Sequence, residues 1–283
     1  MKKKRIGKVL VVIASICVII GAMLVGAGFA RGGNIDALHV GKDNTEWWPF
    51  SANVGLYYRG SAGMIMIDDE NINPSKGNHI WEQELDANDK WDIKVDMGDI
   101  VVKKGSKTSI KVQSIDKSYV SLKKDDGAQV IQVKHPNNKL HNKEAKIELT
   151  LPDNEYTIEI ENKLGDITIS NLTFRKMEIE DDLGDIQLSN IESKATEIDE
   201  KSGDISLKGS FTGKTSIENN LGDIHIEMTG KRDEYYLKIS NDLGDTTINE
   251  DVYELHCKLK QNQGGKHLLE VDNNLGDINI QFR

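Results

Sequence analysis

Residues 160–169 read Ile160-Glu161-Asn162-Lys163-Leu164-Gly165-Asp166-Ile167-Thr168-Ile169, and this frame returns along most of the chain. The Gly-Asp dipeptide occurs seven times, each time among similar apolar residues. The seven glycines are Gly98, Gly165, Gly184, Gly203, Gly222, Gly244 and Gly276. Between Gly165 and Gly222 the spacing is 19 residues, and it then lengthens to 22 and 32. A repeat of this length predicts units that bury their apolar faces against their neighbours.

Within each unit the apolar residues follow the two-residue period of a β-strand. Positions five before, two after and four after each glycine are mostly Ile, Val or Leu, as at Ile160, Ile167 and Ile169. β-Branched residues in these positions suit a pleated surface and disfavour a helix. Between the apolar positions lie Asn, Gly and Asp, which favour sharp corners and can hydrogen-bond nearby backbone. Each unit is therefore expected to form a strand, a tight corner and a second strand.

Stacking such units places each strand beside its equivalent in the next coil, about 4.8 Å away. The sequence therefore predicts an all-β fold, a single-stranded parallel β-solenoid (β-helix) over residues 86–283. A propeller is disfavoured, because each of its blades needs about 40 residues or more. Right-handed coiling is the expectation for parallel crossovers. The prediction includes one buried column formed by Ile167, Ile186, Ile205 and Ile224.

The N-terminus predicts a membrane anchor. Five basic residues within residues 1–8 precede 22 uncharged residues, 9–30, which is long enough to span a bilayer. The flanking positive charge predicts that residues 1–8 stay in the cytoplasm and that the rest is exported. The alternative is a cleaved signal peptide, since Gly28 and Ala30 place small residues before a cleavage point. The apolar run is longer than the apolar h-region of a usual signal peptide, which favours the uncleaved transmembrane helix. Residues 31–85 would then form a membrane-proximal linker or cap region.

Charge and cysteine content indicate an exported protein without disulfides. The formal net charge is −10, and removing the five basic residues before Val9 leaves −15 on the rest of the chain. Such a surface argues against nucleic acid as a partner. The two cysteines are Cys17, inside the apolar run, and Cys257. An exported chain with no internal disulfide suits the surface of a Gram-positive bacterium, where the C-terminal domain would be extracellular on a single-pass anchor in the cell membrane.

An aromatic cluster in the linker region is a candidate contact patch. It consists of Trp47, Trp48, Phe50, Tyr57 and Tyr58 in a chain with few other aromatic residues. Trp and Tyr favour contacts with proteins, carbohydrates and the membrane interface. The alternative, which we favour, is a small satellite core that covers the first solenoid coil, because the open end of a solenoid must be capped.

The sequence predicts no catalytic, cofactor-binding or metal site. The seven histidines are scattered, and no nucleophile, phosphate-loop or zinc spacing occurs. Some β-solenoids are polysaccharide-cleaving enzymes with clustered carboxylates, but here an aspartate follows the glycine in every unit. Calcium held by Asp166, Asp185, Asp204 and Asp223 is the chemical alternative. Aspartates that cap their own turns are the favoured interpretation.

These motifs also carry a family resemblance. Leu151-Pro152 followed by tandem Ile-Glu-x-x-Leu-Gly-Asp-Ile-x-Ile units, over roughly Asp92 to Arg283, resembles an adhesin family of unknown function in bacterial envelope proteins. Some members of that family lie beside envelope-stress regulators such as those of the Lia system. The resemblance implies a β-helical domain at the cell surface, with no established catalytic residues to transfer.

The expected function is a non-enzymatic cell-surface module for binding or scaffolding, in adhesion or in envelope-stress sensing. Its partner would be an envelope protein or a carbohydrate. The alternatives are an envelope carbohydrate-active enzyme of the β-helix type and a calcium-binding structural β-roll.

Overall fold

The computed structural model describes residues 54–59, 63–68, 80–115, 117–134 and 145–283. The chain divides into two compact units, Met1–Pro74 and Ser75–Arg283. In the first unit the described residues form one antiparallel hairpin of β1 (Val54–Arg59) and β2 (Gly63–Asp68). The second unit contains every other described element.

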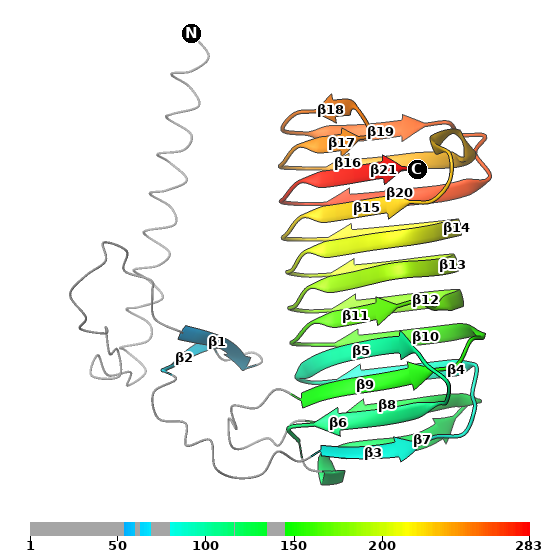
Figure 1. Cartoon of the computed structure of the whole chain (residues 1–283). Helices are drawn as coiled ribbons and strands as arrows, with labels where there is room; N and C mark the ends of the chain where they lie inside the picture. Colours follow the sequence, from blue (N-terminus) through cyan, green and yellow to red (C-terminus); the bar gives the residue numbers. More distant parts are fainter. Residues whose placement is uncertain (1–53, 60–62, 69–79, 116, 135–144) are drawn as a thin grey trace, which may run out of the picture. The chain divides into compact units, whose positions relative to one another are not determined.

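The second unit is one mixed sheet of 19 strands that coils back on itself (Figure 1). Its first strands are β3 (Ile80–Glu84), β4 (Lys90–Val95), β5 (Gly98–Lys104), β6 (Ser109–Gln113), β7 (Val120–Asp125), β8 (Ala128–Val133), β9 (Ala145–Leu151), β10 (Glu155–Asn162) and β11 (Ile167–Ser170). The others are β12 (Thr173–Asp181), β13 (Ile186–Glu200), β14 (Ile205–Asn219), β15 (Ile224–Met228), β16 (Tyr235–Asn241), β17 (Thr246–Ile248), β18 (Asp251–Tyr253), β19 (Cys257–Gln261), β20 (His267–Asn273) and β21 (Ile278–Phe282). Two short 3-10 turns, η3 (Lys117–Tyr119) and η4 (Arg232–Glu234), complete the unit.

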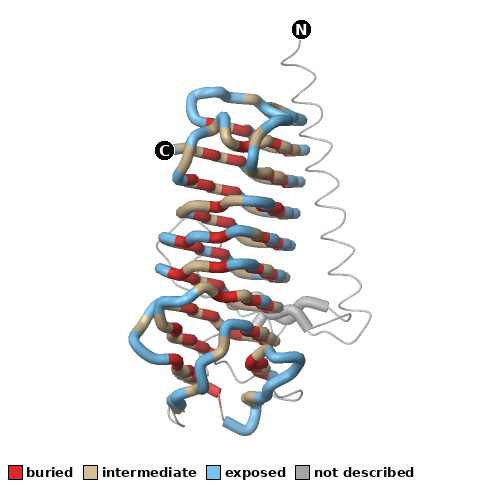
Figure 2. Tube along the Cα trace, turned by 90° about the vertical axis from the view of Figure 1, so that its right-hand side faces the viewer, coloured by how far each residue is buried: buried red, intermediate tan, exposed pale blue. Residues whose placement is uncertain are grey.

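The core consists of columns of aliphatic side chains that run along the stack. Ile205 pairs in register with Ile186 on one side and with Ile224 on the other, and all three are buried. Ile167 pairs with Ile186 in the same way, so the predicted column of four isoleucines is confirmed. The alternating bands of buried and exposed residues in Figure 2 follow from the two-residue period of each strand.

The predicted fold class, a single-stranded parallel β-solenoid, is wrong. The protein is all-β, but its sheet contains antiparallel pairs as well as parallel ones. The antiparallel pairs are β3–β6, β6–β9, β7–β8, β16–β19 and β17–β18. They lie at the two ends of the stack, where a purely parallel coil would leave a row of unpaired backbone groups. The outer strand β19 also carries the exposed Lys258 and Lys260, which oppose pairing with another sheet edge.

The spatial order of the coils differs from their order in the sequence. The coil formed by β20 and β21 lies between the coil of β14 and β15 and the coil of β16 and β17. At the other end, β4 and β5 lie between β8 and β9 on one side and β10 and β11 on the other. Figure 1 shows the red and orange C-terminal strands inserted beside the yellow ones. The chain therefore interleaves its repeats at both ends.

The predicted transmembrane helix over residues 9–30 lies outside the described residues. Within the part of the chain that the structure describes, no helix is long and apolar enough to cross a membrane. Trp47, Trp48 and Phe50 also lie outside the described residues.

Candidate functional site

The Gly-Asp corners align along one edge of the stack, where their aspartates form a ladder. In each step the Oδ1 atom of one aspartate accepts the backbone N–H of the aspartate in the next coil. The donor and acceptor pairs are Asp166 to Asp99, Asp185 to Asp166, Asp204 to Asp185, Asp223 to Asp204, Asp277 to Asp223 and Asp245 to Asp277, at 2.8–3.2 Å. One carboxylate oxygen of each of the six acceptors is thus used to join two coils, and each backbone N–H offsets part of the repulsion between neighbouring aspartates.

Glycine is required at these corners because the coils approach one another through their backbones. A Cβ atom built on Gly203 would lie 1.6 Å from the carbonyl oxygen of Gly184, which no side chain can satisfy. A Cβ atom on Gly222 would lie 2.0 Å from the carbonyl oxygen of Gly203. The glycine column therefore sets the close spacing on which the aspartate ladder depends.

The residue before each glycine is a leucine in most coils, and several of these leucines face solvent. Gly222 N–H donates to the Leu275 carbonyl and Gly276 N–H to the Leu243 carbonyl, both at 3.0 Å, so Leu221, Leu275 and Leu243 occupy consecutive coils. Leu255 lies beside the aspartate ladder instead, because its N–H donates to Asp245 Oδ1 as the N–H of each ladder aspartate does to the aspartate of the preceding coil. The exposed fractions are 48% for Leu221, 45% for Leu275 and 54% for Leu243. We call these three residues the leucine strip.

The leucine strip and the aspartate ladder together form an edge that is apolar and acidic. Asp204, Asp223, Asp277 and Asp245 are exposed directly beside the strip. In the coil below, Ser202 stands in place of a leucine and interrupts the apolar line. We call this surface, residues 202–204, 221–223, 275–277, 243–245 and Leu255, the corner edge.

A polar column lies just inside the corner edge, three residues before each glycine. In spatial order its members are Asn162, Asp181, Glu200, Asn219, Asn273 and Asn241, all buried. Each asparagine donates through Nδ2 to a corner glycine carbonyl, as Asn219 does to Gly203 at 3.1 Å. The column therefore holds the corners in place from the inside.

Two members of this column are carboxyl groups at neighbouring positions. Asp181 is paired in register with Glu200, and they are 2% and 0% exposed. Burial raises the pKa of Asp181 to about 7, although the backbone N–H groups of Leu183 and Asp182 oppose the change. Burial and the neighbouring Asp181 raise the pKa of Glu200 to about 8. The Ser202 N–H, which donates to Glu200 Oε1 at 3.0 Å, acts in the opposite direction and lowers this pKa.

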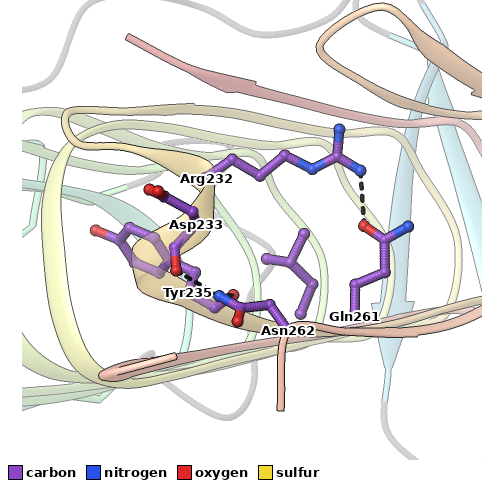
Figure 3. Close-up of a pocket in the computed structure, with 6 residues that line it drawn as sticks. Arg232, Asp233, Tyr235, Gln261 and Asn262 are labelled. Atoms are coloured by element: carbon purple, nitrogen blue, oxygen red, sulfur yellow. Dashed lines mark hydrogen bonds between the residues drawn. The ribbon is translucent and has the colours of Figure 1, made fainter. Parts of the chain in front are cut away.

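A pocket of about 430 Å³ lies between η4 and the edge strand β19 (Figure 3). Its polar groups hold the loop together: the Arg232 guanidinium contacts Asp251 at 2.6 Å and Gln261 at 2.7 Å. Asn262 Nδ2 donates to the Tyr235 carbonyl at 3.1 Å. Because these groups bind one another, the pocket has the character of a structural junction rather than of an active site.

Comparison with known proteins supplies the family. The sequence matches Toastrack DUF4097 over residues 88–281. The chain belongs to this family. No curated protein matches the Toastrack chain. The expectation of a family of unknown function over roughly Asp92 to Arg283 agrees with this match, and the comparisons do not bear on the expected link to Lia-type systems.

Solved structures similar to this Toastrack protein share little sequence with it. One, named a putative cell adhesion protein, from Clostridium sporogenes ATCC 15579, is 16% identical with a TM-score of 0.43, covering 73% of this chain and all of that one. Another, named a putative adhesin, from Bacteroides fragilis NCTC 9343, is 15% identical with a TM-score of 0.34, covering 75% and 100%. A third, named a putative lipid binding protein, from Parabacteroides distasonis ATCC 8503, is 12% identical with a TM-score of 0.36, covering 74% and 98%.

The described histidines of the Toastrack domain are spread over separate positions. His225 Nε2 lies 3.4 Å from Glu227, and His256 Nδ1 lies 3.9 Å from Asp242. His267 Nδ1 accepts the Gly213 N–H at 2.9 Å. Among the described residues, no group of three or more His, Cys, Asp or Glu side chains could hold a metal ion. Asp166, Asp185, Asp204 and Asp223, the alternative calcium ligands, lie instead one per coil in the ladder.

The structure describes only two of the five residues of the predicted aromatic contact patch. Tyr57 and Tyr58 lie on β1, in the first unit, and the other three members lie outside the described residues.

Sequence reasoning missed the polar column of this Toastrack domain. The signal was present, because the position three before glycine shares its strand face with the buried isoleucine five before it.

Proposed function

We propose that this Toastrack domain is a non-enzymatic binding module of the bacterial cell envelope and that it holds its partner along the corner edge. The observation that carries the proposal is the leucine strip, three exposed leucines in consecutive coils beside the aspartate ladder. The partner that fits this surface is a cationic, amphipathic segment of a peptide or protein.

The apolar part of the argument rests on continuity. Single exposed leucines are common on protein surfaces, whereas a contiguous apolar patch marks a contact site. Leu221, Leu275 and Leu243 occupy consecutive coils, so their side chains repeat at steps of about 4.8 Å. Two such steps separate Leu221 from Leu243, so the strip extends for roughly 10 Å, which matches the apolar face of a short helix or strand.

The charge of the edge selects the partner. Asp204, Asp223, Asp277 and Asp245 are exposed beside the leucines, and the chain as a whole carries a net charge of −10. A partner with lysines or arginines flanking its apolar residues would gain from both parts of the surface, and an acidic partner would be repelled.

The same aspartates give little support for catalysis. Each ladder carboxylate accepts a backbone N–H, and the arrangement repeats from coil to coil instead of gathering an acid and a base at one place. A recurring, hydrogen-bonded row of this kind supports a binding surface rather than an enzyme.

The binding experiment uses a triple variant, Leu221→Gln/Leu275→Gln/Leu243→Gln. The probe is a synthetic amphipathic peptide of leucine and lysine, titrated by fluorescence anisotropy. We expect binding by the unmodified domain, at least tenfold weaker binding by the triple variant, and weaker binding at high salt. The matched control is Ile80→Gln/Tyr119→Gln, which removes exposed apolar residues elsewhere and should bind as the unmodified domain does.

Two results would contradict the proposal. One is equal binding by the triple variant and the unmodified domain. The other is equal binding of a peptide with glutamate in place of lysine, because the ladder should repel it. Thermal unfolding of each variant shows that the fold is retained.

The envelope location is a separate part of the proposal. It is supported by the five basic residues within residues 1–8 and the 22 uncharged residues, 9–30, that follow them, which have the composition of a membrane anchor or an export signal. Protease added to intact protoplasts should digest the Gly-Asp repeats, and their complete protection would place the domain inside the cell.

A further inference from the structure

We propose that Asp181 and Glu200 form a buried carboxyl pair that acts as a pH switch in this fold. Both groups must be protonated to hold the corners of their coils from the inside, as the asparagines of the polar column do in the other coils. The switch would act at the coils of β12 and β13. It is independent of what binds the corner edge.

The first argument is hydrogen-bonding chemistry. At the other positions of the polar column, an asparagine Nδ2 donates to a glycine carbonyl, as Asn219 does to Gly203 and Asn273 does to Gly222. A carboxylate has no proton to donate, whereas a carboxylic acid has one. By the repeat, the carbonyl that corresponds to Glu200 is that of Gly184. A protonated carboxyl can therefore do what the amide does in the neighbouring coils.

The second argument is the unsatisfied state of the pair. Neither Oδ1 nor Oδ2 of Asp181 accepts a hydrogen bond of good geometry, although the N–H groups of Leu183 and Asp182 lie near its carboxyl group, and Oε2 of Glu200 has no partner. Both side chains are almost completely buried. Two neighbouring charges in this position would lack water and would have only these few backbone N–H groups to compensate them, a costlier state than two neutral acids.

In the part of the chain that the structure describes, the charged groups that act on the pair include no cation. On β10 and β14 the neighbours in the column are the neutral Asn162 and Asn219. The charged groups that act on the pair from the corners are Asp166, Asp182 and Asp185, all acidic. The nearby lysines have other partners, since Lys201 pairs with Asp182, and Lys163 pairs with Asp96 at 2.6 Å.

The sign of the pH effect follows from the raised pKa values. The pKa of Asp181 rises from 3.8 to about 7 and that of Glu200 from 4.5 to about 8, chiefly through burial. Between these limits the unfolded chain has released both protons and the folded chain still binds them. Stability therefore falls as the pH rises from about 5 to 8, and it levels off once both groups are ionised. The two groups titrate as a coupled pair.

The experiment follows thermal unfolding of the full chain from pH 5 to pH 9. We expect the melting temperature to fall by about 5 °C or more between pH 5 and pH 8.5. The variant Asp181→Asn/Glu200→Gln has permanent donors in both positions. Its melting temperature should change much less over this range, and it should exceed that of the unmodified protein at pH 8.5.

The matched control is Glu180→Gln/Asp199→Asn. These residues directly precede the pair, face outward, and remove the same two charges when substituted. The control should keep the steep pH dependence. A flat profile for the unmodified protein, or equal flattening by the control, would overturn the proposal.

Two further measurements separate the remaining alternatives. Sodium or calcium added at pH 8.5 should leave the melting temperature of the unmodified protein unchanged. A rise to the value of the double variant would mean that a bound cation, not a proton, balances the pair. NMR titration of the carboxyl carbons should show two groups with midpoints well above pH 5, and titration of every carboxyl below pH 5 would equally refute the pair.

Discussion

The Oδ1 atom of Asp204 accepts the backbone N–H of Asp223 at 2.8 Å, although 19 residues separate them in the chain. Asp204 N–H in turn donates to Asp185 Oδ1 at 2.9 Å. The ladder is thus a side-chain addition to the backbone pairing of the parallel strands, and it acts where the chain turns and the regular pairing is interrupted.

The substitution Asp204→Asn should be mild, because the amide oxygen can still accept the Asp223 N–H. Asp204→Ala should cost about 1 kcal/mol, since it removes the acceptor at an exposed position where water can replace it. Urea unfolding measures both. Calcium should change the melting temperature of the unmodified protein by less than about 5 °C. A larger shift that Asp204→Asn abolishes would support the calcium-binding alternative.

The substitution Gly203→Ala should destabilise the protein by about 3 kcal/mol or more, because its Cβ would lie 1.6 Å from the Gly184 carbonyl oxygen. The matched control is Gly264→Ala, where a Cβ would meet nothing within 4 Å. Chemical denaturation compares the two. Similar stabilities would show that neighbouring corners can separate at little cost.

The substitution Ile205→Ala should cost about 2–5 kcal/mol, because Ile205 is buried between Ile186 and Ile224. Ser206→Ala, on the opposite face of the same strand, should change stability by less than about 0.5 kcal/mol. Equal effects in urea unfolding would contradict the assignment of the inner face.

A chain that ends at Gln261 lacks β20 and β21, which join the coil of β14 and β15 to that of β16 and β17. We expect residues 235–261 to lose hydrogen-exchange protection, whereas residues 145–219 keep it. Protection of β16 in the truncated chain would mean that it can stack directly on β14. In a stack that followed sequence order, the same deletion would remove only the outermost coil.

The repeat unit was predictable from the sequence because its determinants are local. Alternation places Ile160 and Ile167 on the inner face, and the Leu-Gly-Asp corner is written in the residues between them. The same alternation places Asn162, Asp181 and Glu200 inside, so the polar column also could have been predicted. It was missed because polar residues beside a glycine were interpreted as part of an exposed turn.

The assembly of the units was not predictable in this way. The sequence led to a purely parallel solenoid, and the antiparallel pairs at both ends, such as β16 with β19, make that prediction wrong. End strands must cover their free edges, and which segment returns to do so depends on contacts between distant parts of the chain.

The sequence by itself determined the all-β unit, its inner and outer faces and the corner chemistry, since these depend on the two-residue period of a strand and on residues within one coil. Only the tertiary structure decided that Leu275 lies between Leu221 and Leu243 and so completes the leucine strip. The physical reason is that every coil presents nearly the same aliphatic face. Apolar burial is not directional, so it cannot choose among neighbours, and the order of the coils is set by connections and end strands that the repeat does not encode.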